Sequence, residues 1–276
     1  MPSRFAWSAG LAAALLAFGA GAGAQAATVM AFDEAVNGAA AQPRTMILDT
    51  DRLRMSNAAV DFIFRGDLSK VWVLRAKSHT YLELTPGGLG QMGARMDQAM
   101  ALMKAKLAAV PEAQRKQVEA MLAAHVGQGA PAAPPQVGYE KAGDSRTVGD
   151  WSCAPYRIVV GGKASSEVCI AKLADLGLSR DDLTVFAGFG AFMAKMTAAM
   201  SVFRSPMSSI DYDSMTKAIG FDGFPVQTTA TLGGGRQIVV TLESIQRQDP
   251  PAGAFDIPAG YTKIDFASMG RLLAPE

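Results

Sequence analysis

The sequence predicts an α+β fold built from an antiparallel sheet and amphipathic helices. Three observations support this prediction. Short runs of β-branched and aromatic residues, separated by turn residues, recur along the chain, as expected for antiparallel strands. Two longer segments carry apolar residues at helical spacing. The only two cysteines flank a glycine turn, an arrangement typical of a disulfide-bonded hairpin.

The first 26 residues have the three-part pattern of a secretory signal peptide. Arg4 precedes an apolar core over residues 11–18, and Ala24-Gln25-Ala26 supplies an A-x-A cleavage site. The apolar core is shorter than the roughly 20 apolar residues that a transmembrane helix needs. We therefore expect export to the periplasm, cleavage after Ala26, and one domain over residues 27–276.

Cleavage at this site would leave a chain whose formal charges balance. Arg4 is the only charged residue in the segment removed, so 25 basic and 25 acidic residues remain. No basic stripe stands out, and no later apolar run approaches membrane-spanning length. We expect no nucleic-acid partner and no membrane-spanning segment.

Residues 28–84 predict an antiparallel meander. Residues 52–55 alternate polar and apolar side chains, as a half-buried strand does. Strands this short and this regularly spaced fit a sandwich, a barrel or a strongly curved sheet. The expected strands cover residues 45–48, 52–55, 62–65, 70–74 and 79–84.

Residues 91–126 predict a helical hairpin inserted between the strands. Six apolar residues recur every three or four positions, which places them on one face of a helix. They are Met92, Met96, Met100, Met103, Leu107 and Val110. Pro111 suits the first turn of a second helix. Residues 127–136 are rich in proline and glycine and predict a stiff linker.

Cys153 and Cys169 predict a structural disulfide. In an exported protein, two cysteines most often pair with each other. Strand-like runs flank Gly161-Gly162, and a turn centred near Gly161 would place the two cysteines opposite each other. A redox pair is more typically spaced C-x-x-C, and a zinc site would need two further ligands. We therefore expect the bond to connect two adjacent strands.

A second amphipathic helix is predicted after Ser179. Ser179 and Asp182 have the spacing of a helix N-terminal cap, and Ser205-Pro206 ends the pattern. Between them, one apolar stripe consists of Phe186, Phe189, Met193, Met196, Met200 and Phe203. Residues 226–232 and 237–245 then predict a final β-hairpin around a glycine turn.

The sequence carries no recognisable catalytic motif. It has no G-x-S-x-G nucleophile elbow, no phosphate-binding P-loop and no H-E-x-x-H metal motif. His79 falls in a predicted strand between polar neighbours, and His125 lies near a predicted helix C-terminus, where it complements the helix dipole. We expect no enzymatic activity, no catalytic residue, no cofactor and no resident metal.

The methionines on the two helical stripes have three interpretations. Their spacing fits an ordinary helix core, and their flexible side chains also fit a deformable apolar binding surface. Thioether clusters in an exported protein can also bind Cu(I), because soft sulfur ligands suit that ion. The spacing alone does not decide between these interpretations.

Several short motifs together resemble a known family. They are Arg52-Leu-Arg54, Phe64-Arg-Gly-Asp67, Gly149-Asp-Trp-Ser-Cys153, Glu167-Val-Cys-Ile-Ala171, Gly223-Phe-Pro-Val226 and Phe255-Asp-Ile-Pro-Ala-Gly-Tyr261. In this order they resemble an exported bacterial domain family of unknown function, which is similar to the LolA/LolB lipoprotein-carrier superfamily. The resemblance implies a curved antiparallel half-barrel whose concave face is covered by amphipathic helices.

The resemblance also implies a function. A cavity between sheet and helices would hold a lipid, a lipoprotein or another apolar ligand in a non-enzymatic periplasmic binding protein. One alternative is a protein-interaction or envelope-stress sensor that binds an apolar peptide, and the other is a Cu(I)-binding protein. The residues expected to line the cavity are Met92, Met96, Met100, Met103, Phe186, Phe189, Met193, Met196 and Met200.

Overall fold

The computed structural model describes most of the chain outside four segments. The described residues are 26–88, 90, 91, 94, 98, 101, 102, 105, 137–199 and 212–265, without the side chains of 197–199, 212–214 and 233. The predicted signal peptide up to residue 25 and the predicted linker 127–136 lie outside the described residues. The same holds for the second arm of the predicted hairpin over 91–126.

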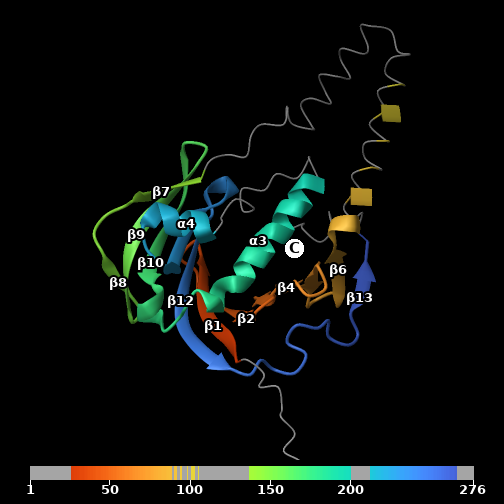
Figure 1. Cartoon of the computed structure of the whole chain (residues 1–276), viewed down its shortest axis with the longest axis horizontal. Coiled ribbons are helices and arrows are strands. Elements are labelled where there is room, and N and C mark those ends of the chain that lie inside the picture. Colours follow the sequence, from red (N-terminus) through yellow and green to blue (C-terminus); the bar gives the residue numbers. More distant parts are fainter. Residues whose placement is uncertain are drawn as a thin grey trace, which may run out of the picture.

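Strands from both halves of the chain form one large, mostly antiparallel sheet (Figure 1). Its order is β13-β6-β5-β4-β3-β2-β1-β12-β11-β10-β9-β7, with β8 paired to β9 alone. Only the β13–β6 pair is parallel in the described part of the chain. The strands are β1 (Ala27–Val36), β2 (Gln42–Leu48), β3 (Arg52–Ser56), β4 (Val60–Arg65), β5 (Lys70–Arg75), β6 (Thr80–Leu84), β7 (Val137–Lys141), β8 (Arg146–Val148), β9 (Trp151–Val160), β10 (Lys163–Lys172), β11 (Gly223–Thr231), β12 (Gln237–Gln248) and β13 (Thr262–Ile264).

The sheet is open, because its outermost strands β7 and β13 are at opposite ends of the strand order. In Figure 1 it curves around one long helix, α3 (Thr184–Ala199). The sequence left a sandwich, a barrel and a curved sheet as possibilities for the strands, and the topology selects the curved open sheet. No helix in the described residues is long and apolar enough to cross a membrane.

Side chains alternate between the two faces of the sheet along each strand, and the side chains of one face pack against α3. Leu53 pairs with Phe64, and Phe64 pairs with Val71, so these three side chains form a cross-strand row. All three are at most 2 % exposed. Phe189 of α3 packs edge-on against the ring of Phe64 at a centroid distance of 5.4 Å. The helix and the sheet therefore share one apolar core, as the spacing of the stripe predicts.

The β9–β10 hairpin contains the disulfide. Gly161 and Gly162 both have positive φ, as a two-residue hairpin turn of this kind requires. Cys153 and Cys169 are bonded, with their Cα atoms 5.4 Å apart. Both cysteines are buried in the core beneath α3.

The two cysteines are not directly opposite each other, which corrects the expectation from the turn position. The turn is centred between Gly161 and Gly162, which alone would pair Cys169 with Ala154, and a register shift between Ala164 and Ser166 adds one residue to β10, so Cys169 pairs with Pro155. Cys153 and Pro155 point to the same face because side chains alternate along a strand. The bond therefore joins diagonal neighbours on one face, which lies toward the core.

The opposite face of the sheet is covered by the segment between β12 and β13. Phe255, in this segment, is buried with Ile63, Trp72 and Leu74 in a second apolar cluster. Arginines from the meander hold the segment in place. The guanidinium of Arg52 lies 4.7 Å from the centroid of the Phe255 ring. Arg54 Nη1 donates to the carbonyl of Ala254 at 2.9 Å, and Arg65 Nη1 donates to that of Phe255 at 3.3 Å.

A further short helix, α4 (Tyr212–Ile219), also packs on this opposite face. Its residue Met215 is buried with Tyr156, Ile158 and Ile170 of the hairpin. The sequence did not predict α4, and its position corrects the expectation that the helices all cover the concave face. The described residues also form three short 3-10 helices: η1 (Leu173–Leu176), η2 (Asp181–Leu183) and η4 (Gly233–Gly235).

The first arm of the predicted helical hairpin is described in part. Its described residues are helical and exposed: Gln91, Ala94, Gln98, Ala101, Leu102 and Ala105. Met92, Met96, Met100 and Met103 lie outside the described side chains, so their predicted face stays a prediction.

Candidate functional site

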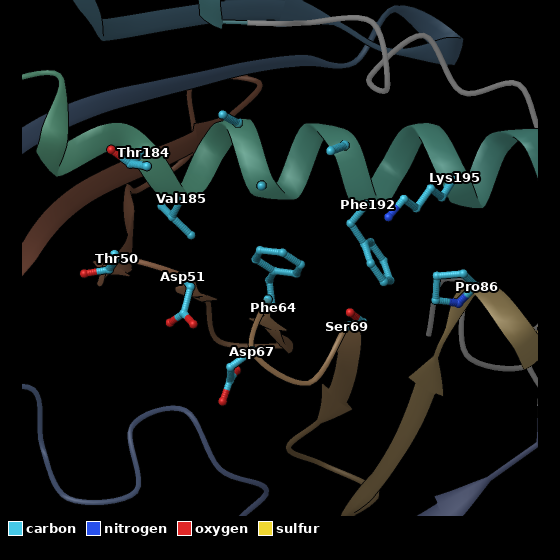
Figure 2. A pocket seen from close by; sticks show the side chains of 14 residues that line it. Thr50, Asp51, Phe64, Asp67, Ser69, Pro86, Thr184, Val185, Phe192 and Lys195 are labelled. Atoms are coloured by element: carbon cyan, nitrogen blue, oxygen red, sulfur yellow. The ribbon is translucent and has the colours of Figure 1, made fainter.

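A pocket of about 440 Å³ lies alongside α3 (Figure 2). The helix forms one wall, and the turns joining β2 to β3 and β4 to β5 form the other. Its residues come from distant parts of the sequence: Thr50 and Asp51, four residues between Phe64 and Ser69, Pro86, and one side of α3 between Thr184 and Lys195. The pocket therefore exists only when the meander and α3 pack together.

The floor of the pocket is apolar. Phe64 and Phe192 meet there with ring centroids 5.6 Å apart, and Val185 lies beside them. These side chains are 2 %, 5 % and 2 % exposed, because they belong to the core as well. Rings and a branched side chain fixed in this way provide a rigid surface for an apolar ligand.

Small residues of α3 leave the space above this floor open. Ala187, Gly188 and Ala191 line the pocket and are exposed. A Cβ atom added at Gly188 would meet its nearest neighbour, a ring carbon of Phe64, at 3.9 Å, an ordinary contact distance. Since larger side chains would fit here, the small residues are not required by the packing of the helix. They leave a volume that a ligand could occupy.

Charged groups lie at the rim of the pocket. Asp51 contributes a carboxylate whose side chain is 52 % exposed and whose pair with Arg52 is long, at 3.9 Å. Asp67 accepts two hydrogen bonds from Arg65, at 2.8 and 2.6 Å, and these lower the pKa of its carboxyl. Lys195 lines the other end, and no ion pair to it is present among the described residues. The pocket is thus acidic near one end and basic at the other.

The predicted cavity residues of the second helix that the structure describes lie in the core and do not line this pocket. Phe189 contacts Phe62 and Phe64, and Phe186 packs near Phe224. Met196 is 8 % exposed, and Met193 is half-buried against the same core. Met200 lies outside the described side chains. The apolar stripe identifies the buried face of α3, and the pocket borders an adjacent face.

Sequence reasoning missed Val185, Phe192 and the small residues of α3. Val185 and Phe192 are more deeply buried than Phe186 and Phe189, although the predicted stripe omitted them. A wider apolar stripe on this helix would have predicted that both residues are buried. Ala187, Gly188 and Ala191 carried no such signal, because small residues on an exposed helix face have no distinctive pattern.

A smaller polar cavity of about 200 Å³ lies at the start of α3. Asp182 is its centre: its carboxylate accepts hydrogen bonds from the backbone N–H and hydroxyl of Ser179, both at 2.7 Å, and from Arg247 at 2.7 Å. Burial raises the pKa of Asp182, but the bonds from Ser179 and Arg247 lower it by more. Ser179 and Asp182 are thus hydrogen-bonded to each other, but the prediction of Ser179 as an N-cap was wrong: η2 (Asp181–Leu183) has Arg180 as its N-cap and no side-chain cap hydrogen bond.

Of the predictions for the two histidines, only the one for His79 can be compared with the structure. His79 was expected in a strand, but it lies in the turn before β6 with φ of 49° and an exposed side chain, in contact with the ring of Tyr261. His125 lies outside the described residues. Within the described ranges, no three His, Cys, Asp or Glu side chains are grouped closely enough to hold a metal ion.

Comparison with known families identifies the chain at the family level. The family model for a domain of unknown function, DUF4412, matches residues 77–261. The chain belongs to the DUF4412 family. This confirms the resemblance to a family of unknown function. The DUF4412 match includes the disulfide hairpin, α3 and the segment around Phe255, and it begins after β4, which supplies Phe64. No curated protein matches the chain.

Two solved structures show low similarity to this DUF4412 chain. A structure of PNGF-II is 9 % identical with a TM-score of 0.38, over 90 % of this chain and 32 % of PNGF-II, so the chain spans about a third of that protein. The LolA superfamily protein NE2245 from Nitrosomonas europaea is 7 % identical with a TM-score of 0.26, over 84 % of this chain and 90 % of NE2245. Because both TM-scores are below 0.5, neither structure supports a conclusion about this DUF4412 chain. Its fold is described from its own sheet topology.

Proposed function

We propose that this DUF4412 chain is a non-enzymatic periplasmic protein that binds an apolar ligand in the pocket beside α3. The ligand would be an acyl chain, alone or as part of a lipoprotein, or an apolar peptide. The observation that carries the proposal is the open volume above Phe64 and Phe192, which the small residues of α3 leave unfilled.

The size and lining of the pocket support this function. Ligand sites in proteins are usually concave, largely apolar and roughly 300–1,000 Å³ in volume, with a few polar groups that orient the ligand. The pocket of about 440 Å³ has an apolar floor and polar groups at its rim, among them Asp51 and Lys195. Burying an apolar chain on the floor would contribute about 25 cal/mol for each Å² removed from water.

The disulfide supports the proposed compartment. Disulfides persist in oxidising compartments such as the periplasm and are rare in the cytosol, and the Cys153–Cys169 bond is buried within the core. Together with the signal-peptide pattern, this favours export and cleavage after Ala26. Strands from Ala27 to Ile264 belong to one sheet, which supports a single domain over residues 27–276.

The test is to find what the native protein carries. We would purify the mature protein from the periplasm without detergent and analyse the intact complex and an organic extract by mass spectrometry. Binding of a fluorescent fatty-acid analogue would then be measured by titration. Acyl species bound at about one per protein would support the proposal, and a copurifying peptide would identify the peptide class of ligand.

A pair of variants assigns binding to the pocket. Ala191→Phe places a ring in the pocket, whereas Ala194→Phe places the same ring at an exposed position of α3 outside it. We expect at least a tenfold loss of affinity in the first variant and no change in the second, with both melting temperatures near that of the wild type. Equal affinity in both variants, or no bound ligand in any preparation, would overturn the proposal.

A further inference from the structure

A lysine ends the row of residues with which α3 lines the pocket. Thr184, Gly188, Ala191 and Lys195 follow one another at spacings of four, three and four residues, so they lie in one row along the helix. Figure 2 shows the Lys195 side chain at the end of the pocket where Phe192 lies. Among the described residues that line the pocket, Lys195 alone is basic. A ligand lying along this row would therefore end beside an ammonium group.

The charges of the lining distinguish the two ends of the pocket. Asp67 is neutralised by Arg65, from which it accepts two hydrogen bonds. Asp51 is 52 % exposed, and its ion pair with Arg52 is long, at 3.9 Å. Lys195 is exposed, and no ion pair to it is present among the described residues. An anionic group is therefore attracted to the Lys195 end and repelled from the Asp51 end.

The surface between the two ends is apolar. Phe64, Phe192 and Val185 form the floor, and their buried side chains hold it in place. Along α3, the row from Thr184 to Lys195 is about 16 Å long, at about 1.5 Å per residue. Because the middle of the row consists of small residues, the space above the floor is open along this length. A ligand with one apolar chain and one anionic head matches the arrangement.

We infer that the pocket selects a single-chain amphiphile with an anionic oxygen head, a carboxylate or a phosphate, which pairs with Lys195. The apolar chain lies over Phe192 and Phe64 toward Val185. A hydrogen bond between two charged groups is roughly twice as strong as one between neutral groups, so Lys195 determines the specificity for the head. The inference rests on the proposed function and narrows it, because an acyl chain in ester or amide linkage has no charged head.

The test compares four probes that share one alkyl chain and differ in the head: decanoate, decyl phosphate, decanol and decylammonium. Calorimetric titrations would use the mature protein, with each probe below the concentration at which it forms micelles or separates from water. We expect at least one of the two anions to bind at least about tenfold more tightly than decanol. Decylammonium should bind more weakly than decanol. The anion with the higher affinity identifies the head.

Variants of Lys195 assign the preference to this residue. Lys195→Gln should lower the affinity for the preferred anion to that for decanol and leave decanol binding unchanged. Lys195→Asp should reverse the preference, so that decylammonium binds most tightly. The matched control is Lys217→Gln, because Lys217 is exposed on α4 and does not line the pocket. It should bind all four probes as the wild type does. Thermal melts check that each variant is folded.

The outcomes separate this inference from the proposed function. If decanol binds as tightly as both anions, or if the preference for an anion survives in folded Lys195→Gln, the inference is overturned. The proposed function would then stand, because an apolar chain still binds. If none of the four probes binds to the wild type, the inference and the proposed binding of an acyl chain are both overturned.

Discussion

Glu83 on β6 and Lys263 on β13 form an ion pair, with 2.6 Å between Oε1 and Nζ, although they are 180 residues apart in sequence. The other carboxylate oxygen of Glu83 accepts hydrogen bonds from Trp72 Nε1 at 3.0 Å and from Lys70 Nζ at 3.3 Å. Bonds from Lys263, then from Trp72, lower the pKa of Glu83 to about 2. This carboxylate joins the edge strand β13 to the meander.

Glu83→Gln should destabilise the protein at neutral pH by about 1–3 kcal/mol, because it removes a charge that accepts three hydrogen bonds. The pKa of Glu83 is lowered in the folded protein, so its stabilisation is complete above the ordinary value of 4.5 and is lost as the pH falls toward 2. Urea unfolding of both proteins should show free energies that converge over this pH range. A constant difference would contradict the role assigned to Glu83.

The disulfide should contribute about 3 kcal/mol to the free energy of unfolding, the value typical of a loop of this length, with cysteines 16 residues apart. We expect a reducing agent to lower the melting temperature of the wild type by several degrees. The double variant Cys153→Ala with Cys169→Ala should melt at that lower temperature with or without reductant. A wild-type melting temperature that does not respond to full reduction would show that the bond does not stabilise the fold.

Two adjacent residues of α3 should respond in opposite ways to an aspartate. Met196 is 8 % exposed in the core, so Met196→Asp buries an unpaired charge and should unfold the protein or cost several kcal/mol. Lys195 is exposed, and Lys195→Asp should change the free energy of unfolding by less than about 1 kcal/mol. Circular dichroism and thermal melts test both. Tolerance of aspartate at 196 would mean that this face of the helix is not buried.

The segment between β12 and β13, on the face of the sheet opposite α3, also contains a buried residue next to an exposed one. Phe255 is 4 % exposed under Arg52, so Phe255→Ala should cost about 3–5 kcal/mol. Asp256 is exposed, and the one interaction described for its side chain is an ion pair with Arg65, so Asp256→Ala should cost less than about 1 kcal/mol. Denaturant titrations of the two variants measure the difference. Similar costs would show that the Phe255 ring is not part of a core.

Much of the secondary structure was predictable because it depends on local patterns. The alternation of Arg52 and Leu53 identified β3, and the glycine pair at 161–162 identified the β9–β10 turn. The apolar stripe of α3 identified its buried face through Phe189 and Met196. Each of these features is set by side-chain periodicity or by backbone conformation within about ten residues.

Features that depend on an extra residue or on distant neighbours could not be predicted. The register shift near Ser165 moved Cys169 opposite Pro155, and no residue in the turn signals it. The short helix α4 has its buried residue Met215 beneath strands far away in sequence. The strand predicted over residues 79–84 began one residue too early, because His79 has a positive φ and belongs to the turn before β6.

The sequence by itself determined the elements that local periodicity controls: the strands of the meander, the disulfide hairpin and the buried stripe of α3. Only the tertiary structure decided which surfaces meet. It brought the turn at Asp51 and the ring of Phe64 against the small residues of α3 to form the pocket. The physical reason is that a cavity is volume left unfilled between elements, and that volume depends on how distant elements pack and not on the pattern within either one.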